Sequence, residues 1–391
     1  MLDEINNTDI IEENESTEGE ESSEDSRIER YQINTFSQDR AIETLLKWYK
    51  NGKLILPEFQ RDFVWSYANS SRLIESILLN LPIPNIFLFK TKDENGEKFL
   101  LIDGLQRITT INQYVDGHWE QGDKKRVFRL HSPNEKWNRK TFAKLDENDQ
   151  QFIYDYPIGT TIFESSSGTE LDQNNVIFSV FERINTGSEK LSDQEIRNAI
   201  YGGECLDTLK DVAPTPDYVA LIEQDKAIMK RGKNIELLLR FITYKHIYDN
   251  TTNGITKLVE SEENSNITTS KKIMLNNYMH YANKGLIDYN KDLENVLEAI
   301  HVISNFDTSA FCVKSKSSDA ISDKVHELFA EALVLAVIKN DYKINISKEK
   351  FIQEKIALWN SETLVEPFKY KTTDYNTVAT RVDFVEKLIR G

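Results

Sequence analysis

Before about residue 205, hydrophobic and polar positions show both the period of strands and the period of helices. After it, the helical period predominates. Before it, short apolar runs alternate with helical patterns, which indicates a mixture of strands and helices. The strands are expected at 54–57, 86–90, 97–102, 127–130 and 158–163, and the helices at 38–49, 66–78, 108–115, 149–154, 174–184 and 192–201. After residue 205, long helices are expected at 235–248, 271–283, 293–305, 322–339, 348–359 and 378–388. This order predicts an α+β protein, with a mixed domain at 31–205 and an all-helical domain at 206–391.

Local signals indicate where several of these elements begin and end. Ser37 and Ser66 are expected to cap two helices, and Ser192–Glu195 has the sequence of a capping box. The sequence DENG at 93–96 is typical of a hairpin between two strands. The polar stretch at 251–270 predicts a mobile loop between two helices.

Charge is distributed unevenly. The formal net charge is −16, but residues 1–26 contain eleven Asp and Glu and no Lys or Arg, so the rest of the chain carries only −5. The composition of residues 1–30 therefore predicts a disordered acidic tail. A solubilising tail and a DNA-mimicking or partner-binding tail both fit this composition. A basic groove is compatible with the remaining chain.

The chain has no sequence signal for a membrane or for secretion. Its N-terminus is acidic rather than basic and apolar, and the longest apolar run, 332–338, is too short to span a bilayer. Cys205 and Cys312 are far apart and lack metal-type spacing, which favours buried thiols in a reducing compartment. We therefore expect a cytoplasmic protein.

The most informative stretch is Asp103-Gly104-Leu105-Gln106-Arg107, which lies between a predicted strand and a predicted helix. At such a turn, the free N–H groups and the helix dipole favour an anion. Gly104 permits a tight turn or the close approach of a ligand, and Arg107 offers a planar donor suited to phosphate. Asp103 is a candidate to hold Mg²⁺, accept a ribose hydroxyl or orient water. We predict a nucleotide site, and expect Arg107→Ala to abolish binding without changing the melting temperature of the free protein.

A second polar cluster, PEFQRDFVW, occupies residues 57–65. Gln60 is a candidate to contact a base edge or a ribose, and Arg61 to bind a phosphate or to form a salt bridge. Trp65 fits either stacking on a base or anchoring of the following helix.

A third cluster combines FERINTG at 181–187 with EIRNA at 195–199. Arg183 and Asn185 are expected at a helix end, next to a glycine turn whose N–H groups can hold an anion. The same residues also fit a helix C-cap in which Arg183 compensates the helix dipole.

Three motifs occur in the order PxFQRxxVW, DGxQRxTT and FxRINTGxxxLxxxEIRNA. Together they resemble the N-terminal domain of GmrSD-type restriction systems, over about residues 36–205. The resemblance implies a ParB/sulfiredoxin-like fold that binds and often hydrolyses nucleoside triphosphates, with GTP or ATP and Mg²⁺ as the expected ligands. It assigns catalysis to Asp103, Gln106 and Arg107, with Asp103 as the metal ligand. The residues that it assigns to nucleotide binding are Gln60, Arg61, Gly104, Arg183, Asn185 and Arg197.

The chain departs from this family in two respects. Leu105 replaces the first Gln of the family's Asp-Gly-Gln-Gln-Arg motif, which leaves hydrolysis an open question while binding is retained. Many relatives carry an HNH nuclease, but no two of the six histidines here lie within ten residues of each other. A separate nuclease subunit is therefore the expected partner.

The sequence thus predicts a nucleotide-binding regulatory subunit of a bacterial modification-dependent restriction or anti-phage system, in which NTP hydrolysis stays open. Two alternatives remain. One is a DNA-binding ParB-like module, against which the acidic balance counts. The other is a non-enzymatic interaction protein with a degenerate nucleotide site.

Overall fold

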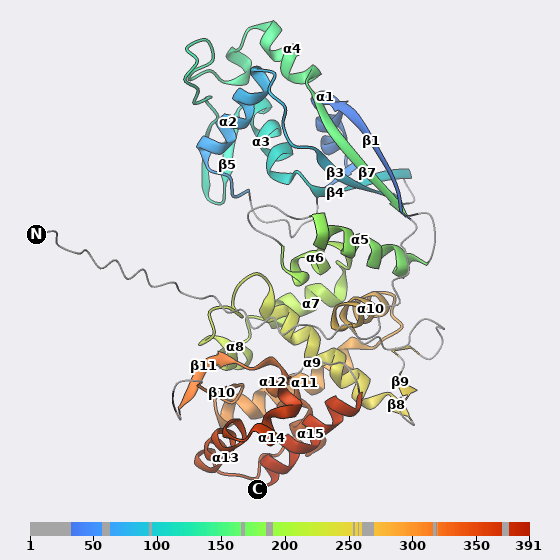
Figure 1. The fold of residues 1–391 in the computed structure, drawn as a ribbon, viewed down its shortest axis with the longest axis vertical. Coiled ribbons are helices and arrows are strands. Elements are labelled where there is room, and N and C mark those ends of the chain that lie inside the picture. The colour runs from blue at the N-terminus through green and yellow to red at the C-terminus, as the bar shows by residue number, and fades with distance from the viewer. Residues whose placement is uncertain are drawn as a thin grey trace, which may run out of the picture.

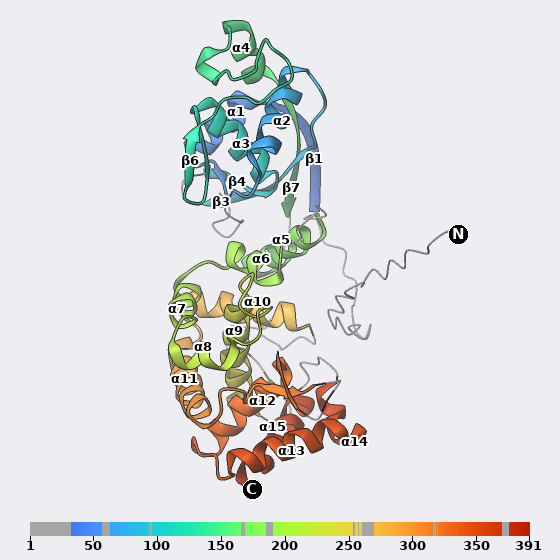
Figure 2. The same cartoon turned by 90° about the vertical axis from the view of Figure 1, so that its left-hand side faces the viewer.

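The computed structural model describes residues 33–56, 63–93, 96–165, 169–184, 191–252, 255–256, 258–259, 270–315, 318, 320–369 and 375–391. These residues form an elongated molecule, with a sheet-containing region at one end and a helical region at the other (Figure 1, Figure 2). The predicted acidic tail, 1–30, and most of the predicted loop at 251–270 lie outside the described residues.

A five-stranded sheet frames the N-terminal region. Its strands, in spatial order, are β1 (Ile33–Ala41), β7 (Pro157–Ser165), β3 (Ile86–Asp93), β4 (Gly96–Asp103) and β2 (Leu54–Ile55). The β1–β7 and β3–β4 pairs are antiparallel, whereas the β3–β7 and β2–β4 pairs are parallel. The predicted hairpin between β3 and β4 is confirmed.

Strand β4 is buried on both faces because its apolar residues are consecutive. Phe99 and Leu101 belong to one core, whereas Leu100 and Ile102 belong to another. The helices α1 (Ile42–Lys50), α2 (Tyr67–Leu78), α3 (Leu105–Val115) and α4 (Glu147–Asp155) contribute to the first core. The second core contains the apolar face of α5 (Glu170–Ile184) and Ile196 of α6 (Asp193–Ile200).

Helices α5 and α6 connect this sheet to the helical region (Figure 1). Leu171 of α5 and Tyr201, just after α6, belong to the core of the helical region. The other helices of that region are α7 (Glu204–Val212), α8 (Pro216–Ile222), α9 (Lys233–Asp249), α10 (Lys271–Asn283), α11 (Tyr289–Phe306), α12 (Glu327–Lys339), α13 (Lys348–Asn360), α14 (Glu362–Val365) and α15 (Tyr375–Arg390).

The predicted α+β organisation, with a sheet in the N-terminal part and a helical C-terminal part, is confirmed. Several element boundaries are also confirmed. Ser66 accepts a hydrogen bond from the Asn69 N–H as the N-cap of α2, and Ser192 and Glu195 form the expected capping box of α6. Helix α10 has the predicted bounds.

The prediction of a helix starting at Ser37 was wrong. Ser37 lies in β1 opposite Thr161, and α1 begins only at Ile42. Pairing along the whole length of β1 outweighs the local capping signal, because a β-ladder is stabilised by a distant segment that local patterns cannot reveal.

Other short strands were also missed or misplaced. The strand expected at 127–130 lies earlier in the chain, as β6 (Lys124–Val127), which forms a hairpin with β5 (His118–Gln121). Phe128 and Leu130 are buried but follow the strand. The helical region also contains two hairpins, β8 (Thr251–Thr252) with β9 (Ile255–Thr256), and β10 (Cys312–Lys314) with β11 (Ile321–Val325). Strand β11 occupies the start of the helix expected at 322–339.

Both cysteines are free and buried, as predicted. Burial raises the pKa of the Cys205 thiol to about 12, so this thiol stays protonated and unreactive near neutral pH. Within the described ranges, the structure contains no helix with the length and apolarity needed to cross a bilayer.

Candidate functional site

Strand β4 ends at Asp103, and the chain turns at Gly104 directly into α3. Gly104 has a φ of 113°, in the region that favours glycine, and is the N-cap of α3. A Cβ at this position would lie 2.5 Å from Cγ2 of Ile86 on β3. Glycine therefore serves both the turn and its close packing on the sheet, and it leaves the N–H groups of α3 without a side-chain cap.

Arg107 is held within the turn rather than extended into solvent. It is 8 % exposed. Its NH2 group donates to Oδ2 of Asp103 at 2.6 Å, and its NH1 group donates to the carbonyl of Pro84 at 2.9 Å. The guanidinium thus ties the end of β4 to the segment that enters β3. The side chain of Asp103 remains 41 % exposed, which leaves its other oxygen accessible.

Gln106 organises the neighbouring loop. Its Oε1 accepts hydrogen bonds from the N–H groups of Val64 and Trp65, at 3.1 and 3.2 Å. Gln121 donates to the carbonyl of Val64 at 2.8 Å. Trp65 is partly buried against the N-terminal core, which supports its role as an anchor of α2. The end of the PEFQRDFVW segment is therefore attached to the Asp103–Arg107 turn.

The remaining predicted site residues are placed differently. Gln60, Arg61 and Asn185 lie outside the described residues. Arg183 is exposed in the last turn of α5, and within the described chain it forms no hydrogen bond or ion pair with the Asp103–Arg107 turn.

Arg197, by contrast, is fully buried, with 0 % exposure. Its Nε donates to Oδ1 of Asn276 on α10 at 2.9 Å, and its NH1 lies 3.7 Å from Glu236 on α9. Gln194 also accepts a hydrogen bond from this guanidinium. The contacts of Arg197 connect α6 to the helical region. Its predicted role in nucleotide binding rests on the sequence alone.

Further polar contacts extend this connection. Asn175 on α5 contacts Asn276 and Asn277 on α10, each at 3.2 Å, and the hydroxyl of Tyr201 donates to Asn175 at 3.0 Å. Although burial opposes ionisation of Glu236, the charges of Arg197 and a neighbouring lysine lower its pKa. A buried, largely satisfied polar network therefore joins α5 and α6 to α9 and α10.

Comparison with protein families gives a match over residues 42–202, to the family described as GmrSD restriction endonuclease, N-terminal domain. Residues 42–202 belong to this family. The match includes the Gly104 turn, Gln106 with its loop, and the Arg197 connection. No curated protein matches the chain.

Sequence reasoning missed the partners that position the motif residues of this GmrSD N-terminal domain. Ile86 sets the space around Gly104, and the carbonyl of Pro84 holds Arg107. No local pattern marks either residue, because both contacts are made across neighbouring strands. A backbone carbonyl, in addition, carries no side-chain signature.

Among the described residues of the GmrSD N-terminal domain, Asp103 places a carboxylate next to the α3 N-terminus. No group of three or more His, Cys, Asp or Glu positioned to hold a metal occurs among the described residues. A single Asp103 carboxylate fits a Mg²⁺ ion that is also bound by phosphate oxygens, which is the usual arrangement for Mg²⁺ with nucleotides. The uncapped N–H groups of α3 fit a phosphate.

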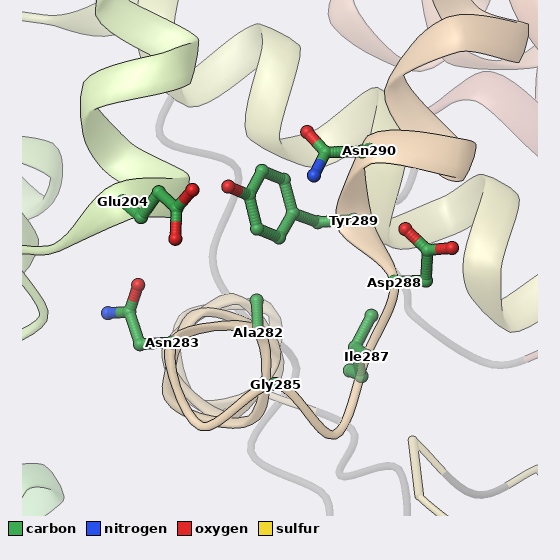
Figure 3. A pocket seen from close by; sticks show the side chains of 8 residues that line it. All are labelled: Glu204, Ala282, Asn283, Gly285, Ile287, Asp288, Tyr289 and Asn290. Carbon is green, nitrogen blue, oxygen red and sulfur yellow. The ribbon is translucent and has the colours of Figure 1, made fainter.

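A shallow cavity of about 320 Å³ lies elsewhere, in the helical region (Figure 3). Glu204 from α7 faces Tyr289 and Asn290 from α11, and Asn283 and Ile287 complete the rim. None of the motif residues of the GmrSD N-terminal domain lines this cavity.

We predict that Gly104→Ala destabilises the protein more than Gly96→Ala does. Both glycines have nearly the same φ, 113° and 114°, but nothing lies within 4 Å of a Cβ at Gly96. The control therefore measures backbone strain alone, and contact with Ile86 should add about 1–3 kcal/mol. Urea unfolding of both variants measures the difference, and equal losses would show that Ile86 yields without cost.

The contacts of Arg107 revise the expectation that its removal leaves the free protein unchanged. We predict that Arg107→Ala lowers the free energy of unfolding by about 1–3 kcal/mol, because it leaves the Pro84 carbonyl and Asp103 without their donor. Arg183→Ala is the control, since that exposed side chain should change stability by less than about 0.5 kcal/mol. Similar thermal denaturation of both variants would contradict a structural role for Arg107.

Proposed function

We propose that this chain is the nucleoside triphosphate-binding regulatory subunit of a restriction or anti-phage system, and that it acts with a nuclease on another chain. The observation that carries the proposal is the β4–Gly104–α3 turn. It leaves the N-terminus of α3 free of a side-chain cap, within a domain of the GmrSD restriction endonuclease N-terminal family.

Phosphate binding is supported by the backbone rather than by Arg107. The first N–H groups of α3 and the positive end of its dipole favour a phosphate next to Gly104. Arg107 acts as a positioning residue, because its bonds to Asp103 and Pro84 fix the turn. Gln106 supports the site in the same way, since it holds Val64 and Trp65 beside it.

Asp103 is the residue that would hold Mg²⁺ when the nucleotide is bound. Mg²⁺ would neutralise phosphate charge there and polarise the terminal phosphate. Arg107 uses Oδ2 of Asp103, so Oδ1 is the oxygen left for the ion or for a water molecule that it orders.

Hydrolysis depends on residue 105. Leu105 is partly buried against the N-terminal core, so this chain presents an apolar side chain at the start of α3. An apolar group cannot orient water or stabilise charge on the phosphate, and we infer that the chain binds nucleotide and hydrolyses it slowly.

Nucleotide-dependent regulation requires a route to the helical region. The polar network of Asn175, Arg197, Glu236 and Asn276 provides one, because it couples the domain that carries the turn to α9 and α10. A nucleotide that changes the position of α5 or α6 would have to rearrange these buried bonds.

A non-enzymatic interaction protein is the second candidate. The observation that favours it is the combination of Leu105 packed on the core and Arg107 used within the fold. In that case the turn is retained for structure alone.

We predict that ATP or GTP with Mg²⁺ raises the melting temperature of the full chain. Binding at a hundredfold excess over Kd stabilises a protein by about 2.7 kcal/mol. A thermal-shift series with ATP, GTP, CTP and UTP measures this, and the matching nucleosides are the control because they lack the phosphates. No shift with any of the four triphosphates would leave the interaction protein as the better description.

We predict that Leu105→Gln raises the rate of phosphate release from the preferred triphosphate at least tenfold, because it restores an amide at the start of α3. Leu105→Met is the matched control, since it keeps an apolar side chain of similar size. Phosphate release is measured with both variants at saturating nucleotide. Equal rates for the Gln and Met variants would mean that residue 105 does not limit hydrolysis.

A further inference from the structure

A segment rich in exposed basic side chains lies on the sheet-containing region, outside the Asp103–Arg107 turn. Residues 124–144 contain eight Lys and Arg and one Glu, a net charge of +7 within a chain of net charge −16. The segment comprises β6 and the loop that leads to a short 3-10 helix, Phe142–Lys144. Figure 2 shows β6 at the outer edge of this region. We call this segment the β6 basic surface.

Most of these charges have no ion-pair partner among the residues that the structure describes. Lys125 pairs with Glu120 at 3.0 Å, and Lys136 pairs with Asp149 at 2.8 Å. In the part of the chain that the structure describes, no carboxylate forms an ion pair with the other basic side chains that are exposed here. These are Lys124, Arg126, Arg129, Arg139 and Lys144.

The β6 basic surface is built on an aromatic support. The guanidinium of Arg126 lies 3.7 Å from the ring centroid of Tyr67 and 4.7 Å from that of Trp119. The hydroxyl of Tyr67 accepts from the N–H of Arg129 at 2.8 Å and donates to the carbonyl of the same residue. These contacts fix the guanidinium of Arg126 and the backbone of Arg129 before any partner binds.

The loop after β6 brings a third arginine to the same place. Arg139 has a φ of 59°, which is unfavourable for a residue with a side chain. Its N–H donates to the carbonyl of Leu130 at 2.7 Å, and the N–H of Leu130 donates to Lys140 at 2.8 Å. The backbones of Arg139 and Lys140 are thereby held beside Leu130, the residue that follows Arg129.

We propose that the acidic segment 1–26 of the same chain occupies the β6 basic surface and shields it from other polyanions. The charges are complementary, since residues 1–26 contain eleven Asp and Glu and no Lys or Arg. Reach is not an obstacle, because 32 residues precede Ile33 and a random coil of that length has an end-to-end distance of about 30 Å and a fully extended length of about 100 Å.

The intramolecular occupant is favoured over a nucleic acid for two reasons. Attachment to β1 of the same domain gives residues 1–26 an effective concentration in the millimolar range, without the loss of free translation that a separate partner incurs. A nucleic acid, in contrast, approaches a chain that still carries a net charge of −5 outside residues 1–26, and it meets the eleven acidic residues of that segment as well.

Carbodiimide cross-linking of the full chain tests the proposal, because it joins only carboxylates and amines in direct contact. Peptide mass spectrometry should show residues 1–26 linked to Lys125, Lys140 and Lys144 at least fivefold more often than to exposed lysines Lys230 and Lys291. Raising NaCl from 50 to 500 mM should remove this preference, because salt screens exposed charges.

Two triple variants provide the matched comparison. Lys124→Gln with Arg129→Gln and Arg139→Gln should reduce the links to Lys125 and Lys140 at least threefold. The control variant carries Lys226→Gln, Lys230→Gln and Lys233→Gln, which removes the same charge from exposed positions of the helical region and should leave those links unchanged. An equal spread of links over all exposed lysines would overturn the proposal.

A second measurement separates the acidic segment from a nucleic acid. Replacing the eleven acidic residues of 1–26 by their amides should increase the affinity of the chain for a 25-base-pair DNA duplex at least fivefold. The same replacement should give no increase when the β6 basic surface carries the Lys124, Arg129 and Arg139 substitutions. If the surface variant loses duplex binding while this amide variant binds as the unmodified chain does, the surface serves nucleic acid and the proposal is wrong.

Discussion

The burial of β4 on both faces is the constraint on which the rest of the N-terminal region depends. Phe99 and Leu101 need the helices α1 to α4, whereas Leu100 and Ile102 need α5. Helices must therefore cover the sheet on both sides. The chain can leave β4 only through a tight turn, and this requirement places Gly104 against Ile86 and the start of α3 beside the sheet.

The Asp103–Arg107 pair illustrates how a motif residue can fix the geometry of a turn. From sequence, an arginine next to a helix N-terminus is naturally interpreted as a phosphate ligand. Here two of its N–H groups hold Asp103 and Pro84, and no side chain caps the backbone N–H groups at the start of α3. Gln106 similarly uses its amide oxygen to fix Val64 and Trp65. Arg107 and Gln106 thus maintain the geometry of the turn and of the segment beside it.

The sequence predicted those parts of the fold whose signals are local. The capping boundaries at Ser66 and Ser192, the β3–β4 hairpin and the strand–glycine–helix turn all depend on neighbouring residues. Strand β1 was missed because its partner β7 lies more than a hundred residues away. Arg197 was predicted as a nucleotide ligand, yet the sequence could not reveal its bonds to Asn276 and Glu236, since long-range pairing leaves no mark on local spacing.

The buried position of Arg197 has a consequence for how such proteins can be recombined. The family match ends at residue 202, whereas the partners of Arg197 lie in α9 and α10. A fragment cut at the end of the match would lose Asn276 and Glu236 together with the helices that carry them, and would keep only Gln194 among these polar partners. The segment that matches the family is therefore shorter than the segment that contains the hydrogen-bond and ion-pair partners of Arg197. A gene fusion that exchanged the helical half would have to bring Asn276 and Glu236, or their equivalents, with it.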